Sequence, residues 1–153
     1  MTPIALSLYN VVLFVHILAV VVAFGAILAY PLFFSLAERS TPARRAGVHS
    51  VQGLVGSKVM PWSLLVIILA GAYMASDRDY WAEPWVGIPF LIALIVGGIG
   101  GGYLAPRERK LAELADGGDQ AEYAATLKSV KAVGGVLTLL VVLAIFLMTT
   151  KLG

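Results

Sequence analysis

Four long apolar stretches dominate the sequence, and each is close to the length needed to cross a lipid bilayer. They cover about residues 6–36, 60–75, 86–105 and 133–150. A helix needs roughly 17–25 residues to span the hydrocarbon layer, and the less apolar residues before Met60 can extend the short second stretch. The sequence therefore predicts an all-α, polytopic membrane protein, an antiparallel bundle of four transmembrane helices.

The composition agrees with a lipid environment and limits the kinds of partner that we expect. Only 13% of the residues are charged, whereas a soluble domain carries roughly 25%. The net charge of +2 comes from residues in the loops, so we expect the lipid bilayer as partner and no nucleic acid. The chain has no cysteine, which excludes disulfides, thiolate metal sites and cysteine nucleophiles.

The positions of Lys and Arg predict the orientation in the membrane. All but two of the 11 basic residues lie in or beside the first and third loops. Basic residues near helix ends stay in the cytoplasm. We therefore expect a multi-pass protein of the cytoplasmic (inner) membrane, with loops 38–50 and 106–132 in the cytoplasm and both termini outside. The N-terminus lacks the positive region of a signal peptide, so the first apolar stretch is interpreted as an uncleaved helix.

Capping residues and prolines set the expected helix boundaries within one domain over 1–153. Thr41 precedes Pro42, a pair typical of an N-cap and the first helical position. Asp119 with Glu122 resembles a capping box, and Pro61 is expected to kink the second helix. The helices are predicted at about 6–37, 42–76, 85–115 with a break near 106, and 119–150.

Small residues at helical spacing are the expected packing positions. Helices in lipid associate largely where small side chains allow close approach. The candidates are Ala19, Ala23, Ala26, Gly71, Ala75, Gly97, Gly98, Gly101 and Gly102. They indicate either a compact bundle or a smooth glycine surface that admits a flat ligand or a partner helix. The second alternative predicts a homo-oligomer or a larger membrane complex.

His16 is the main candidate functional residue. It lies within the first apolar stretch, where an ionisable side chain is costly and is by default a functional candidate. It shares a helix face with Ala19 and Ala23, so it should point into the bundle. One ring nitrogen needs a partner, and the other could bind a proton, haem iron or copper. The alternatives are a hydrogen bond between helices or a water-accessible histidine.

Met74 and Met148 are weaker candidates for the same site. Both are expected near the outer ends of their helices, and thioether sulfur together with imidazole suits Cu(I). Methionine is also an ordinary filler of apolar gaps. His49 lies roughly 25–35 Å from His16 along the helices, so the two cannot share one haem. We interpret His49 as a solvated residue at a helix end.

The motifs of common enzyme classes are missing from the sequence. No acidic residue lies within an apolar stretch, and there is no P-loop, serine elbow or zinc-ligand spacing. We therefore assign no catalytic residues and favour a protein that is not an enzyme.

Short motifs give the chain a resemblance to known membrane proteins. They are Leu13-Phe14-Val15-His16-Ile17-Leu18-Ala19-Val20 with Gly25 following, Leu69-Ala70-Gly71-Ala72-Tyr73-Met74, and Phe146-Leu147-Met148-Thr149-Thr150-Lys151. The chain resembles an uncharacterised family of bacterial four-helix integral membrane proteins. It is more remotely similar to copper-resistance D-type proteins and HemJ-type protoporphyrinogen oxidases. The resemblance implies an antiparallel four-helix bundle and a first-helix histidine, here His16, which in HemJ-type members is associated with haem b.

Two functions follow as hypotheses. In the first, the bundle binds haem b or a metal ion, copper, with His16 as the ligand. In the second, it is a non-catalytic accessory or self-associating subunit of a membrane complex, packed through the glycines of the third helix.

Overall fold

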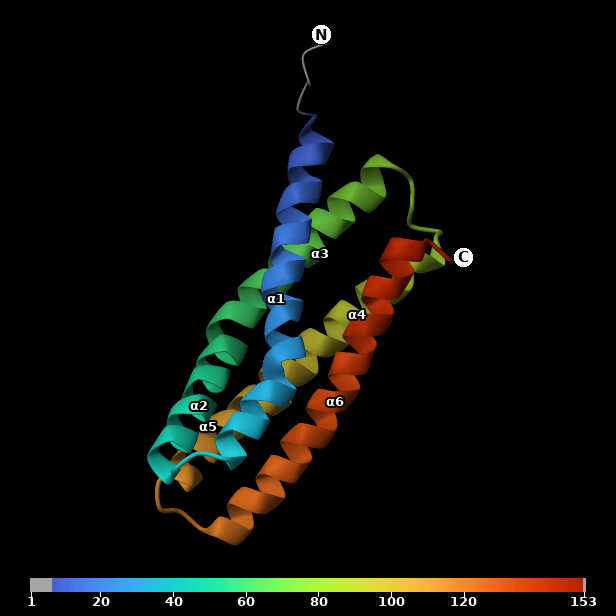
Figure 1. The fold of residues 1–153 in the computed structure, drawn as a ribbon. Coiled ribbons are helices and arrows are strands. Elements are labelled where there is room, and N and C mark those ends of the chain that lie inside the picture. The colour runs from blue at the N-terminus through green and yellow to red at the C-terminus, as the bar shows by residue number, and fades with distance from the viewer. Residues whose placement is uncertain (1–6, 153) are drawn as a thin grey trace.

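Four long helical rods joined by short loops make up residues 7–152, the part of the chain that the computed structural model describes (Figure 1). The rods are α1 (Leu8–Glu38), α2–η1–α3 (Pro42–Leu54, Val55–Val59, Met60–Asp77), α4–η2–α5 (Pro84–Ile99, Gly100–Leu104, Ala105–Ala115) and α6 (Gln120–Thr150). All four are long and apolar enough to cross a membrane. The predicted all-α architecture with four membrane-length helices is confirmed. The expected helix start at residue 6 lies outside the described residues.

Side-chain caps fix where α1 and α6 begin. The Ser7 hydroxyl accepts a hydrogen bond of 3.3 Å from the backbone N–H of Asn10. The Asp119 carboxylate accepts from the N–H groups of Ala121 and Glu122, at 2.8 and 3.3 Å. These bonds satisfy donors that a helix start leaves free. Only half of the expected capping box forms, because the Glu122 side chain pairs with Lys110 of α5.

Prolines produce two π-helical segments, η1 and η2, inside the second and third rods. A proline cannot donate to the carbonyl four residues earlier, and its ring crowds that carbonyl. For Pro61 and Pro106 these carbonyls belong to Ser57 in η1 and Gly102 in η2. The wider turn absorbs the missing donor, so the third rod continues through Pro106 to Ala115 and the break expected near 106 is absent.

Each rod packs against different neighbours in its two halves (Figure 1). Helix α1 packs mainly on α3, α2 on α5, and α4 on α6. Helix α1 begins and α6 ends at the same end of the bundle as the α3–α4 loop. The opposite end, which we call the basic end, carries the α1–α2 loop (39–41) and the α5–α6 loop (116–119).

Alanines mark the interface between α1 and α3. Ala19 and Ala23 of α1 are buried, and Ala26 is half-buried beside them. Ala75 of α3 is buried as well. Short side chains at these positions let the two backbones approach, which is the usual basis of helix association in lipid.

The glycines of the third rod divide into two groups. A Cβ atom at Gly97 would lie 3.3 Å from Cδ1 of Leu64, so this glycine allows α4 to approach α3. At Gly98, Gly101 and Gly102 an added Cβ would meet nothing within 4 Å. These three exposed glycines therefore do not mediate packing within the described bundle.

Large apolar side chains cover the outside of the bundle. Leu32, Trp62 and Leu139 are each at least 70% exposed. A water-soluble monomer rarely exposes contiguous apolar surface on this scale, whereas lipid chains solvate it without cost. The exterior is therefore that of a bundle solvated by lipid.

Candidate functional site

His16 lies in the interface between α1 and α3 and makes one hydrogen bond across it. Its ring is 9% exposed, and Nδ1 lies 3.1 Å from the carbonyl oxygen of Ile67. A Cβ atom at Gly71 would come within 3.4 Å of the His16 ring carbon Cε1, so the glycine makes room for the imidazole. The small residues of both helices thus place the ring against the α3 backbone.

This hydrogen bond fixes the tautomer of His16. A carbonyl oxygen can only accept, so Nδ1 carries the proton and donates to Ile67. Nε2 is then the nitrogen with a free lone pair, and it makes no hydrogen bond to the residues that the structure describes. A backbone carbonyl that accepts a hydrogen bond from the other ring nitrogen is a common arrangement around metal-bound imidazoles.

A cavity of about 420 Å³ adjoins His16, and we call it the His16 cavity. Residues from α1, α3, α4 and α6 line it, and they include Met74 and Met148. The structure thus brings the three candidate ligands predicted from the sequence to one cavity. Its volume is within the range of small-molecule sites, which are roughly 300–1,000 Å³.

Aromatic side chains form much of the wall of the His16 cavity. The rings are those of Tyr9, Phe24, Tyr80, Trp81, Trp85 and Phe90. Tyr80 packs edge-on to Trp85, with ring centroids 5.0 Å apart, and Trp81 packs edge-on to Phe90 at 5.8 Å. A wall of this kind favours a flat, apolar ligand.

Two cations lie at the end of the His16 cavity near the termini. The Arg78 guanidinium is 4.5 Å from the ring centroid of Tyr9, and the Lys151 ammonium is 5.3 Å from that of Trp85. Lys151 itself lines the cavity. Arg78 and Lys151 are the two basic residues that do not lie in or beside the first and third loops. Their position would favour a ligand that combines an apolar body with an anionic group.

A metal held by protein ligands alone would need methionine here. Among residues 7–152, no cluster of three or more His, Cys, Asp or Glu side chains could hold a metal ion. The His16 cavity offers one imidazole and the thioethers of Met74 and Met148, a soft set of donors that suits Cu(I). The residues present therefore fit either a haem with His16 as axial ligand or a copper ion.

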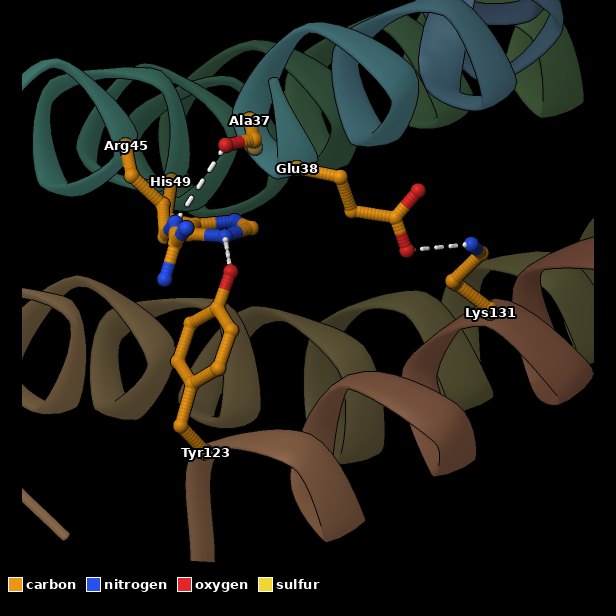
Figure 2. A network of polar contacts seen from close by, with 6 residues as sticks. All are labelled: Ala37, Glu38, Arg45, His49, Tyr123 and Lys131. Carbon is orange, nitrogen blue, oxygen red and sulfur yellow. Dashed lines mark hydrogen bonds and ion pairs between the residues drawn. The ribbon is translucent and has the colours of Figure 1, made fainter. Parts of the chain in front are cut away.

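His49 is not the solvated residue that the sequence suggested. Its side chain is fully buried at the basic end. Nδ1 lies 3.0 Å from Oε1 of Gln52. Nε2 lies 2.8 Å from the Tyr123 hydroxyl of α6 (Figure 2). The expectation was wrong because α2 and η1 together present His49, Gln52 and Gly56 on one face, at helical spacing, toward the neighbouring helices.

The surroundings of His49 tie three helices together at the basic end (Figure 2). The Arg45 guanidine Nε donates to the carbonyl of Ala37, at 3.3 Å, and its guanidinium lies 5.2 Å from the ring centroid of Tyr123. Lys131 of α6 pairs with Glu38 of α1 at 2.8 Å. Both nitrogens of His49 are engaged within this network, so we assign His49 a structural role and no ligand.

Glu108 is a buried carboxyl group that the sequence analysis missed. It has no exposed surface, and neither carboxylate oxygen has a hydrogen-bond partner in the described part of the chain. It lines a second cavity, of about 300 Å³, together with Tyr30 and Gly56, and we call this the Glu108 cavity. The sequence placed it in the predicted cytoplasmic loop 106–132, but Leu104, Glu108 and Leu111 recur at helical spacing and could have indicated a buried face.

The hydrogen bond between His49 and Tyr123 should contribute measurably to stability. Removing one partner leaves a buried polar group unsatisfied, which costs about 1–3 kcal/mol. We expect His49→Ala and Tyr123→Phe each to lower the free energy of unfolding in mixed micelles, with a coupling energy of about 1 kcal/mol in a double-mutant cycle.

Ser50→Ala is the control for this cycle, because its hydroxyl bonds only to the Ala46 carbonyl of the same helix. It should leave stability nearly unchanged. Strictly additive effects of the His49 and Tyr123 variants would contradict the assigned network.

Comparison of the chain with protein-family models, with curated proteins and with solved structures finds no significant match.

Proposed function

We propose that this chain is an integral protein of the cytoplasmic membrane that binds haem b or a copper ion at His16. The observation that carries the proposal is the hydrogen bond from Nδ1 to the Ile67 carbonyl. The lone pair of Nε2 is then not used by this bond, and His16 lines a cavity that Met74 and Met148 also line. A histidine that served only to join two helices would not require such a cavity.

The two candidate ligands make different use of the same residues. For haem b, His16 would supply a nitrogen ligand, the aromatic wall would accept the flat apolar part of the group, and Lys151 and Arg78 would offer positive charge to its carboxylates. For copper, His16 and one or both thioethers supply the donors. Either group, when bound, supplies one-electron chemistry.

We further propose that both termini and the α3–α4 loop lie outside the cell. In support, Arg39, Arg44 and Arg45 lie at the basic end with Arg107 and Arg109, and such clusters stay in the cytoplasm. The cations at the other end are Arg78 and Lys151. With this orientation the His16 cavity lies in the outer half of the membrane and the Glu108 cavity in the inner half.

The ligand can be identified spectroscopically. Protein purified gently from a host supplied with haem and copper should show a Soret band or stoichiometric copper, and His16→Ala should lose either one. If the ligand is copper, Met74→Leu and Met148→Leu should reduce its binding. If the ligand is haem, both variants should keep a Soret band of unchanged intensity.

Asn10→Ala is the matched control, since Asn10 lies on α1 with an exposed side chain. It should retain the ligand. Folded wild-type protein that carries neither haem nor copper would contradict the proposal, and thermal unfolding separates that outcome from misfolding.

Cysteine labelling tests the orientation. The chain has no cysteine, so single-cysteine variants need no prior substitution. A membrane-impermeant maleimide added to intact cells or spheroplasts should label Asp79→Cys and leave Ala43→Cys unlabelled until the membrane is permeabilised. The reverse pattern would contradict the proposed orientation.

A non-catalytic, self-associating or accessory role is the second candidate function. The observation that favours it is the exposed glycine surface, where Gly98, Gly101 and Gly102 meet no other part of the bundle. A glycine surface allows a second helix to approach closely in lipid. The occupant could be another copy of this chain or a helix of a larger membrane complex.

Leucine substitutions at the glycine surface test this role. If the surface is an interface between copies, Gly98→Leu and Gly102→Leu should shift the protein from an oligomer to a monomer in light-scattering measurements. Gly87→Leu is the control, because Gly87 is an exposed glycine of the same helix with open space around it. An oligomeric state that none of the three variants alters would contradict this role.

A further inference from the structure

The Glu108 cavity has a composition that differs from that of the His16 cavity. Its walls are almost entirely apolar and rich in glycine, with Gly56, Gly97, Gly100, Gly101 and Gly134 among them. Glu108 and Tyr30 are the polar side chains in the lining. Both π-helical segments contribute to it, and such segments are frequent at functional sites.

Within the part of the chain that the structure describes, Glu108 has no ion-pair partner that would compensate its charge. The described residues form ion pairs through Asp77, Glu122 and Glu38, and none of these pairs includes Glu108. The neighbouring Arg107 is held elsewhere, with its guanidinium 3.5 Å from the ring centroid of Tyr103. The Tyr30 hydroxyl interacts with the carboxyl, but not at hydrogen-bond geometry. A buried carboxylate without a counter-charge is expensive and calls for a functional explanation.

Gly56 lies directly beside the carboxylate. A Cβ atom added to Gly56 would lie 3.3 Å from Oε2 of Glu108 and 3.4 Å from the Cβ atom of Ala105. The glycine therefore lets η1 pack closely against α5, and it lines the cavity together with Glu108.

The cavity reaches the lipid-facing surface of the bundle. Pro61 and Leu65 of α3 and Gly101 of η2 line the cavity and are exposed. Ile27, Tyr30 and Glu108 line its buried part. A ligand that partitions into the membrane could thus enter from the bilayer with its apolar part against the outer walls.

We propose that the Glu108 cavity binds a small hydrophobic organic cation, such as an arylammonium, with the Glu108 carboxylate as its counter-charge. The apolar walls accept the body of the ligand, and the carboxylate selects its charge. The volume of about 300 Å³ limits the ligand to a compact molecule. This site is independent of His16 and of the ligand proposed there.

Equilibrium binding of radiolabelled phenyltrimethylammonium tests the proposal, with purified full-length protein in the uncharged detergent dodecyl maltoside. Glu108→Gln preserves shape and removes the charge, so it should weaken binding by about tenfold or more. Glu113→Gln, an exposed carboxylate on the same helix α5, should bind as tightly as the wild type. His16→Ala should also leave binding unchanged.

A neutral molecule of the same shape separates charge recognition from simple filling of an apolar space. Unlabelled phenyltrimethylammonium should displace the bound probe, and tert-butylbenzene should displace it at least about tenfold less effectively. This comparison uses wild-type protein, so it holds even if Glu108→Gln fails to fold. Equal displacement by the two molecules, or unchanged binding to folded Glu108→Gln, would overturn the proposal.

Discussion

Every backbone polar group within a lipid bilayer must find its hydrogen bond inside the protein, and the fold follows from this constraint. It explains why the chain forms four long helices and why Pro61 and Pro106 do not interrupt them. At each proline the helix widens into a π-helical turn, where the N–H of Met60 donates to Val55 and that of Ala105 to Gly100. These two widened turns also contribute to the Glu108 cavity.

The buried polar side chains of the bundle differ in how well they are satisfied. His49 has a partner on each ring nitrogen and joins α2 to α6. His16 is satisfied on one nitrogen only, and Glu108 has no hydrogen-bond partner among the described residues. The last two also line cavities. Incomplete pairing beside open space is what distinguishes a candidate binding group from a structural one.

The site was only partly predictable from sequence. His16, Met74 and Met148 could be found because their depth along the apolar stretches and their helix faces predict a common level in the bundle. Glu108 and His49 were missed because charged neighbours suggested solvated loops. In the structure, α2 and α5 extend beyond the apolar stretches and pack against each other, which buries both residues. Local charge does not show which face of such a helix is covered.

The sequence by itself determined the medium, the number of helices and their approximate ends, because apolar length, capping residues and prolines act over a few residues. Only the tertiary structure decided which polar groups are paired. Ile67, the partner of His16, lies 51 residues away along the chain, and Tyr123, which joins His49 to α6, lies 74 residues away. The cavity that Glu108 lines likewise depends on Gly56 of a different rod, which packs closely against the carboxylate. These contacts depend on how whole helices pack, which no local pattern specifies.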